Sequence, residues 1–254
     1  MALVILQTIE SKNDMRLFLC LIIFSAIYPA HSQDRKYFDA PFGGGGGYTP
    51  AWYIPNVDPI NEKVKAFGLS ELTTNGFYTS GGAGFIYIGF IPYLRIGGMG
   101  YSGSTSESIT QSGINNEVIY SIGGGGLTVE YTLPFIKNWG VSVGAIIGSG
   151  SFEIEIYQNR SSYNWDDVWT TSGGLMIMDI SRTIKNSFWI LSPTLNIDIP
   201  VYRFVSFRIG GGYQISLSNS WTLDNDRDLS GIPSDLNGNS FFIQSGIFIG
   251  FFSY

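Results

Sequence analysis

Four aspartates near the C-terminus have a spacing that could bind calcium. Asp224, Asp226 and Asp228 occupy alternate positions, and Asp235 is the twelfth residue counted from Asp224, as in calcium-binding loops. The sixth position is Leu229, where such loops need glycine. Asp235 is also shorter than the usual bidentate glutamate. The sequence therefore favours a solvated acidic loop, with calcium binding as the weaker alternative.

A pair of carboxylates, Glu153 and Glu155, is the other candidate for chemistry. Paired carboxylates catalyse glycoside hydrolysis when they flank a bound sugar. These two lie on the same side of one expected strand, with no cleft or substrate platform evident, so they are expected to face water.

The only cysteine, Cys20, and the only histidine, His31, both lie at the N-terminus. Residues 17–30 are an apolar run preceded by Arg16 and followed by a small residue at Ser32, which predicts a signal peptide over residues 1–32. Met15 is an alternative start. A mature chain of residues 33–254 would lack the groups used in thiolate catalysis, Ser-His-Asp triads and histidine metal sites. We therefore expect no cofactor and no enzymatic activity.

The composition excludes several classes of protein. Of 254 residues, 44% are hydrophobic and 13% charged, and the net charge is −6. The apolar content is too high for a disordered chain. A pI near 4.7 provides no basic field for nucleic acid.

The chain after residue 43 consists of long alternating segments, which are typical of β-strands with one apolar face. Short turns at 91–93, 133–138 and 199–202 alternate with longer polar connections at 55–76, 102–116, 158–186 and 218–239. The eight expected strands are 44–54, 79–90, 93–103, 117–132, 139–157, 186–199, 203–217 and 240–254. Their length suits a bilayer, in which a sheet must close on itself. The sequence thus predicts an all-β, antiparallel, up-and-down transmembrane barrel forming one domain over residues 33–254.

This architecture resembles the small eight-stranded outer-membrane barrels of the OmpA and OmpX transmembrane type, although no family motif is matched. The resemblance implies short periplasmic turns, long extracellular loops and a monomer surrounded by outer-membrane lipid. The final strand carries Phe248 and Phe252 on one face and ends on Tyr254, and it looks like the signal read by the bacterial barrel assembly machinery.

Two groups of residues are expected near the short turns. Arg95, Glu130, Asp198 and Arg208 fall on the polar faces of their strands, and charges inside a barrel need partners. We predict that they form an interior network. Aromatic residues near the same turns predict a periplasmic girdle, formed by Phe90, Tyr93, Tyr131, Phe135, Trp139, Tyr202 and Phe204.

Two local features complete the expectation. Asp58 as cap, Pro59 at the first turn and Gly68 at the end predict a helix in the first loop, either as a lid over the barrel mouth or as a docking element. In the fifth strand the apolar positions change from odd to even, which predicts a β-bulge at residues 148–150.

The leading hypothesis is a non-enzymatic outer-membrane barrel with a structural, adhesive or partner-binding role through its external loops. The first alternative is a channel or carrier for small solutes, if a glycine-lined interior stays hollow. The second is a secreted, lipocalin-like barrel with the apolar face turned inward around an apolar ligand.

Overall fold

The computed structural model describes residues 42–136, 139–160, 179–202 and 204–253. The expected signal peptide and Tyr254 lie outside these residues. The strands are β1 Phe42–Tyr48, β2 Ala51–Pro55, β3 Phe77–Tyr87, β4 Leu94–Gln111, β5 Ile114–Thr132, β6 Gly140–Arg160, β7 Ile180–Tyr202, β8 Val205–Leu223, β9 Arg227–Asp228 and β10 Ser240–Ser253. One helix, α2, covers Asp58–Ala66.

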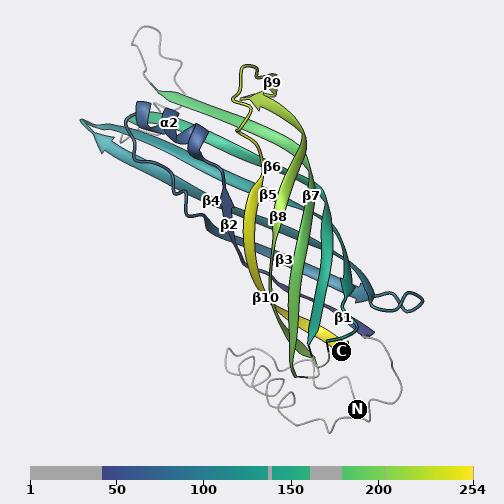
Figure 1. The fold of residues 1–254 in the computed structure, drawn as a ribbon. Coiled ribbons are helices and arrows are strands. Elements are labelled where there is room, and N and C mark those ends of the chain that lie inside the picture. Colours follow the sequence, from purple (N-terminus) through teal and green to yellow (C-terminus); the bar gives the residue numbers. More distant parts are fainter. Residues whose placement is uncertain (1–41, 137–138, 161–178, 203, 254) are drawn as a thin grey trace, which may run out of the picture. The chain divides into compact units, whose positions relative to one another are not determined.

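The strands form a closed antiparallel barrel with eight wall positions (Figure 1). β1 and β2 share one position, because both pair with β10 on one side and with β3 on the other. The interruption between them falls at Pro50, which has no N–H for the ladder. β10 closes the ring by pairing with β8, and the two-residue β9 lies outside it. The eight-stranded, up-and-down architecture expected from the sequence is confirmed.

One end of the barrel, here called the turn end, carries the short connections, and the opposite end is called the mouth end. At the turn end, Pro200 lies within β7 rather than in the expected turn. It comes after the last β6–β7 pair, Gly140 with Asp198, so its missing N–H breaks no bond to β6. The turn itself follows Tyr202.

At the mouth end the strands are longer than expected. β4 and β5 stay paired as far as Gln111 and Ile114, and a two-residue turn with positive φ at Ser112 (51°) and Gly113 (80°) joins them. This is the backbone of a tight hairpin turn. The expectation of a loop over 102–116 is therefore wrong. Serines and threonines occupy both faces of this part of β4, so the apolar alternation that marks a strand is absent.

The β-bulge predicted in the fifth strand is also misplaced. β6 pairs continuously with both neighbours through residues 148–150. The β7–β8 pairing shifts instead, once near Pro200 at the turn end and once near the mouth end, where Ser187 pairs with Ser220 but Trp189 pairs with Leu217. Two residues of β8 thus oppose one residue of β7, and Ser218 adopts a φ of 55°.

What changes along β6 is the chemistry of its two faces. Near the turn end, Ser142 is buried inside while Val143 and Ile147 are exposed outside; near the mouth end, Phe152 and Ile154 are buried inside. The same face of the strand is polar at one level and apolar at the next. The wall is therefore apolar on its outer face near the turn end and apolar on its inner face near the mouth end.

Helix α2 closes the mouth end. Val57 is its N-cap, so Asp58 is the first helical residue rather than the expected cap. Ile60 and Val64 pack into the main apolar core, together with residues of β5, β6 and β7. Asn61 accepts from the N–H of Leu72 (2.8 Å) and donates to its carbonyl (3.0 Å), which holds the return segment against the helix. Among the described residues, no helix is long and apolar enough to cross a membrane.

Candidate functional site: the interior charge cluster and the outer wall

The four charged residues predicted to meet inside the barrel do so, as two cross-strand pairs. Arg95 of β4 lies opposite Glu130 of β5, and Asp198 of β7 lies opposite Arg208 of β8. The tight turns fix these registers, and the period of two places all four side chains inside. Arg95 and Asp198 are completely buried.

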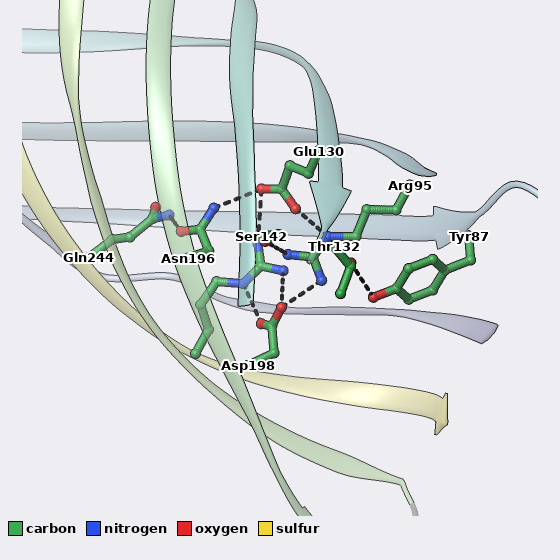
Figure 2. A network of polar contacts seen from close by, with 9 residues as sticks. Tyr87, Arg95, Glu130, Thr132, Ser142, Asn196, Asp198 and Gln244 are labelled. Carbon is green, nitrogen blue, oxygen red and sulfur yellow. Dashed lines mark hydrogen bonds and ion pairs between the residues drawn. The ribbon is translucent and has the colours of Figure 1, made fainter. Parts of the chain in front are cut away.

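The two pairs join into one charge cluster (Figure 2). Arg95 Nε donates to Glu130, and Arg95 Nη1 donates to Asp198 Oδ2 at 2.5 Å. Arg208 donates from Nε and Nη2 to the carboxylate of Asp198 at 2.6 and 3.1 Å. The Nη1 atom of Arg208 lies 3.6 Å from Glu130. Two cations thus balance two anions, which burial requires.

Neutral groups satisfy the remaining donors and acceptors of the cluster. Ser142 accepts from Arg95 Nη2 (2.6 Å). Asn196 donates to Glu130 (2.8 Å) and accepts from Gln244 (2.7 Å), so the hydrogen bonds continue from β5 across to β10 (Figure 2). The network therefore joins opposite walls of the barrel.

Aromatic side chains pack against the two guanidinium groups of the charge cluster. The guanidinium carbon of Arg95 lies 4.4 Å from the centre of the Phe85 ring, and that of Arg208 lies 4.5 Å from the Phe248 ring. These are cation–π distances. Phe248 and Phe252, expected to share one face of the last strand, both belong to this buried aromatic group. Their role as an assembly signal stays a prediction, and Tyr254 lies outside the described residues.

The interior above the charge cluster is also filled. A cavity of about 10 Å³ borders Glu130 and Arg208, which is room for about one water molecule. Above it, Tyr53 stacks between Tyr101 and Phe242, with ring centres 4.8 and 5.2 Å apart. The apolar core under α2 follows. The charge cluster, these stacked rings and the apolar core therefore occupy the barrel interior one after another towards the mouth end.

The predicted turn-end aromatics are where the sequence placed them in the chain. Phe90 and Phe135 project from the turns, and Tyr131, Trp139, Tyr202 and Phe204 are each at least two-fifths exposed. Tyr93 packs against Tyr131, with ring centres 6.0 Å apart. These seven residues are called the turn-end belt.

A second group of exposed aromatics was missed by the sequence analysis. This mouth-end belt consists of Tyr48, Trp52, Tyr78, Trp189, Tyr213 and Phe241, all exposed on the outer wall. Trp52 pairs with Tyr78, and Tyr213 pairs with Phe241. The usable signal was an outward-facing aromatic far from the turn end of β3, β7, β8 and β10, whereas β4, β5 and β6 carry none at that level.

The four aspartates of the calcium hypothesis do not come together. No group of three or more acidic, histidine or cysteine side chains in the described segments could hold a metal ion. Asp224 instead accepts from Arg182 (2.7 Å) and from the N–H of Thr183 (3.1 Å). These contacts, the backbone bond foremost, lower the pKa of Asp224 below its usual value. Asp226 lies in the tight turn before β9.

Glu153 and Glu155 both face outward on β6. Glu153 forms an ion pair with Lys185 at 3.0 Å, and Glu155 accepts from Tyr157 at 2.5 Å. Each carboxylate thus has a neighbour of its own, and the two do not face each other across a cleft.

The projecting part of β4 has one unpaired edge. β3 pairs with β4 only as far as Ser102, whereas β5 follows β4 to Gln111. Within the described residues, no strand pairs with the second edge of β4 beyond Ser102. Glu107 is the only charged residue between positions 103 and 111. The inner face of this projecting sheet contacts the helix segment, because Asn116 donates to the carbonyl of Phe67 (3.4 Å).

The fold and the site define an eight-stranded up-and-down barrel with a filled interior. Similar solved structures include the attachment invasion locus protein Ail of Yersinia pestis (TM-score 0.37, 11% identity, covering 84% of this chain and 100% of that one). They also include a major outer membrane protein of Thermus thermophilus (0.45, 11%, 82% and 99%) and OprG of Pseudomonas aeruginosa (0.38, 9%, 84% and 94%). No family model matches the chain, and no curated protein matches it in sequence. The likeness to these structures is therefore one of general fold only.

Proposed function

We propose that the protein is a non-enzymatic bacterial outer-membrane barrel, closed to solutes, that holds a small β-sheet above the membrane for binding a partner polypeptide. The unpaired edge of β4 is the observation that carries the binding role. An exposed sheet edge is a template for an added strand. This edge lacks proline, lysine and bulges, the usual devices that block such pairing.

The outer wall supports the membrane location. Between the two aromatic belts, the outward positions of the described strands are apolar, glycine or serine, and none is charged. On β10, Phe241 and Phe251 are ten positions apart. A rise of about 3.3 Å per residue, tilted by roughly 40°, gives a band about 25 Å tall. That matches the apolar band of outer-membrane barrels.

The filled interior favours a closed barrel over the channel or carrier alternative. The charge cluster and the stacked aromatics fill successive levels of the barrel, and α2 covers the mouth. Purified protein in planar bilayers is expected to give no steady ion current. A stable conductance at neutral pH would restore the channel hypothesis.

Two arginine substitutions on one face of β6 test the membrane location. Ile147 and Ser151 both face outward, four positions apart. Ile147→Arg is expected to destabilise the barrel in lipid vesicles by about 2–4 kcal/mol, and Ser151→Arg by about 0–1 kcal/mol. Urea titration followed by tryptophan fluorescence gives both values. Equal, small effects would place the band elsewhere or argue for a soluble barrel.

A peptide with the sequence of residues 114–121, the natural neighbour of β4, tests the open edge. The labelled peptide is expected to bind the intact barrel in fluorescence anisotropy. Alternate residues of a strand direct their N–H groups to opposite edges, so Glu107→Pro and Ser108→Pro act on different edges. One variant should lose peptide binding and keep its resistance to heat, and the other should weaken the β4–β5 hairpin. Unchanged binding in both variants would refute the edge as the site.

A further inference from the structure

A shallow groove of about 580 Å³ crosses the outer wall near the mouth-end belt. It is open to the outside of the barrel wall and is bordered by β5, β6, β7 and β8. Its lining is mostly glycine and serine, together with Lys185, the exposed Trp189 and the buried Phe188.

The groove follows from the strand register. Gly123 of β5, Ser151 of β6, Ser187 of β7 and Ser220 of β8 are successive cross-strand partners, so one row of small residues crosses four strands. Larger side chains stand on either side. Trp189 borders the row towards the turn end, and Lys185, held by Glu153, borders it towards the mouth end. The β8 bulge lies at the end of this row, and bulges are frequent next to functional sites.

The polar groups of the groove are available to a ligand. Within the described residues, the hydroxyls of Ser149, Ser151, Ser187 and Ser220 have no hydrogen-bond partner, nor has the indole N–H of Trp189. Trp52, another member of the mouth-end belt, differs from Trp189, because the indole N–H of Trp52 donates to the carbonyl of Asn75 at 2.8 Å. Trp189 is also 63% exposed, so one face of its ring is open.

We propose that this groove binds the sugar headgroup of a glycolipid in the outer leaflet. An open indole face packs against the C–H face of a sugar ring, and a row of hydroxyls with one amine can hydrogen-bond its hydroxyl groups. Trp189 belongs to the mouth-end belt, where headgroups would lie. This inference rests on the membrane location proposed above, because only a membrane-embedded wall presents the groove to lipid headgroups.

The test measures which lipid stays bound to the intact barrel. Protein is refolded in phosphatidylcholine vesicles containing dilute monoglucosyl dioleoylglycerol or dilute dioleoylglycerol, which have the same acyl chains. It is then released into mild detergent, and native mass spectrometry counts the retained lipid. Methyl glucoside, which has no acyl chain, forms a third arm. Unboiled gel mobility, recorded on the same samples, reports whether the barrel is folded in the membrane.

Wild-type protein is expected to retain the glucosyl lipid about tenfold more than dioleoylglycerol, and to retain no methyl glucoside. Ser149→Leu combined with Ser187→Leu fills the groove and should abolish this preference. Ser104→Leu combined with Ser106→Leu, at outward positions of β4 away from the groove, should leave it unchanged. Trp189→Leu should lose the preference, and Trp189→Phe should keep part of it.

Three results would overturn the inference. Equal retention of both lipids would show binding through acyl chains alone. Equal binding of methyl glucoside would show a site for free sugar rather than for a lipid. A preference that survives groove filling would place the lipid elsewhere. If instead the unboiled gel shift is lost in wild type, the membrane location itself fails, and the groove proposal falls with it.

Discussion

Arg95 is the residue whose removal should unbalance the barrel interior most. It is fully buried and contacts Glu130, Asp198 and Ser142. Arg95→Met keeps much of the side-chain volume but leaves two buried carboxylates facing one cation, Arg208. Removing one partner of a buried ion pair costs about 3–5 kcal/mol, because the remaining charge is desolvated without compensation. We expect a loss of that size in the free energy of unfolding.

A second substitution should restore most of this loss. The double variant Arg95→Met with Glu130→Gln removes one anion together with the cation. The hydrogen bonds from Arg208 to Asp198, at 2.6 and 3.1 Å, remain. Neutral replacements of buried ion pairs are often harmless or stabilising. The double variant should therefore be more stable than Arg95→Met alone, by about 2 kcal/mol or more.

Urea unfolding in lipid vesicles measures all of these variants. The matched control is the exposed ion pair of Lys65 and Glu71, whose side chains are 61% and 51% exposed. Lys65→Met should cost no more than about 1 kcal/mol. The reasoning fails if Arg95→Met costs as little as this control, or if the losses of Arg95→Met and Glu130→Gln simply add in the double variant.

Three further predictions follow from single contacts. Gly148→Ala should destabilise the barrel by about 1–3 kcal/mol in urea titration, because the added Cβ would lie 2.0 Å from the carbonyl oxygen of Gly125. Gly98→Ala should be tolerated, because its added Cβ would lie 3.6 Å from the nearest atom. Asn61→Leu leaves the backbone of Leu72 unpaired, so limited proteolysis should cut the segment after α2 faster; an unchanged rate would show that the clamp is dispensable. The folded-state pKa of Asp224 is lowered, so its contribution to stability is present above its unfolded pKa and is lost as the pH falls through the folded pKa. Asp224→Asn should remove this contribution alone, so the stability difference between wild type and variant should shrink as the pH falls, and a difference that does not change with pH would contradict the prediction.

The sequence was most informative where two constraints coincided. Arg95 and Glu130 stand at inward positions of neighbouring strands, close to tight turns, so both the face and the register followed from position alone. Charged residues at such positions have to meet a partner in an interior away from water. The charge cluster was therefore predictable, while its neutral partners were not, because Asn196 and Gln244 reach it only through the curvature of the closed wall.

The sequence was least informative at the mouth end. Between Ser102 and Gln111, serines and threonines occupy both faces of β4, and no apolar alternation marks a strand that stands in water. From sequence alone, the ends of these longer strands therefore look like loops. The mouth-end belt and the groove were missed for the same reason, since neither can be located before the height of each strand is known.

The change of face in β6 shows what the alternation rule measures. Leu127, Ile147 and Leu191 are successive cross-strand partners, and all three face outward. Towards the mouth end, the cross-strand partners Ile122 and Phe152 are buried inside. β5, β6 and β7 thus exchange their apolar face at about the same level, with no register shift between β5 and β6 or between β6 and β7. A local bulge would move one strand relative to its neighbours, whereas a change of surroundings moves the apolar face of every strand together. Under the membrane location proposed above, the reversal marks the level at which the outside of the wall passes from lipid to water, and it can be read from sequence wherever neighbouring strands reverse in register.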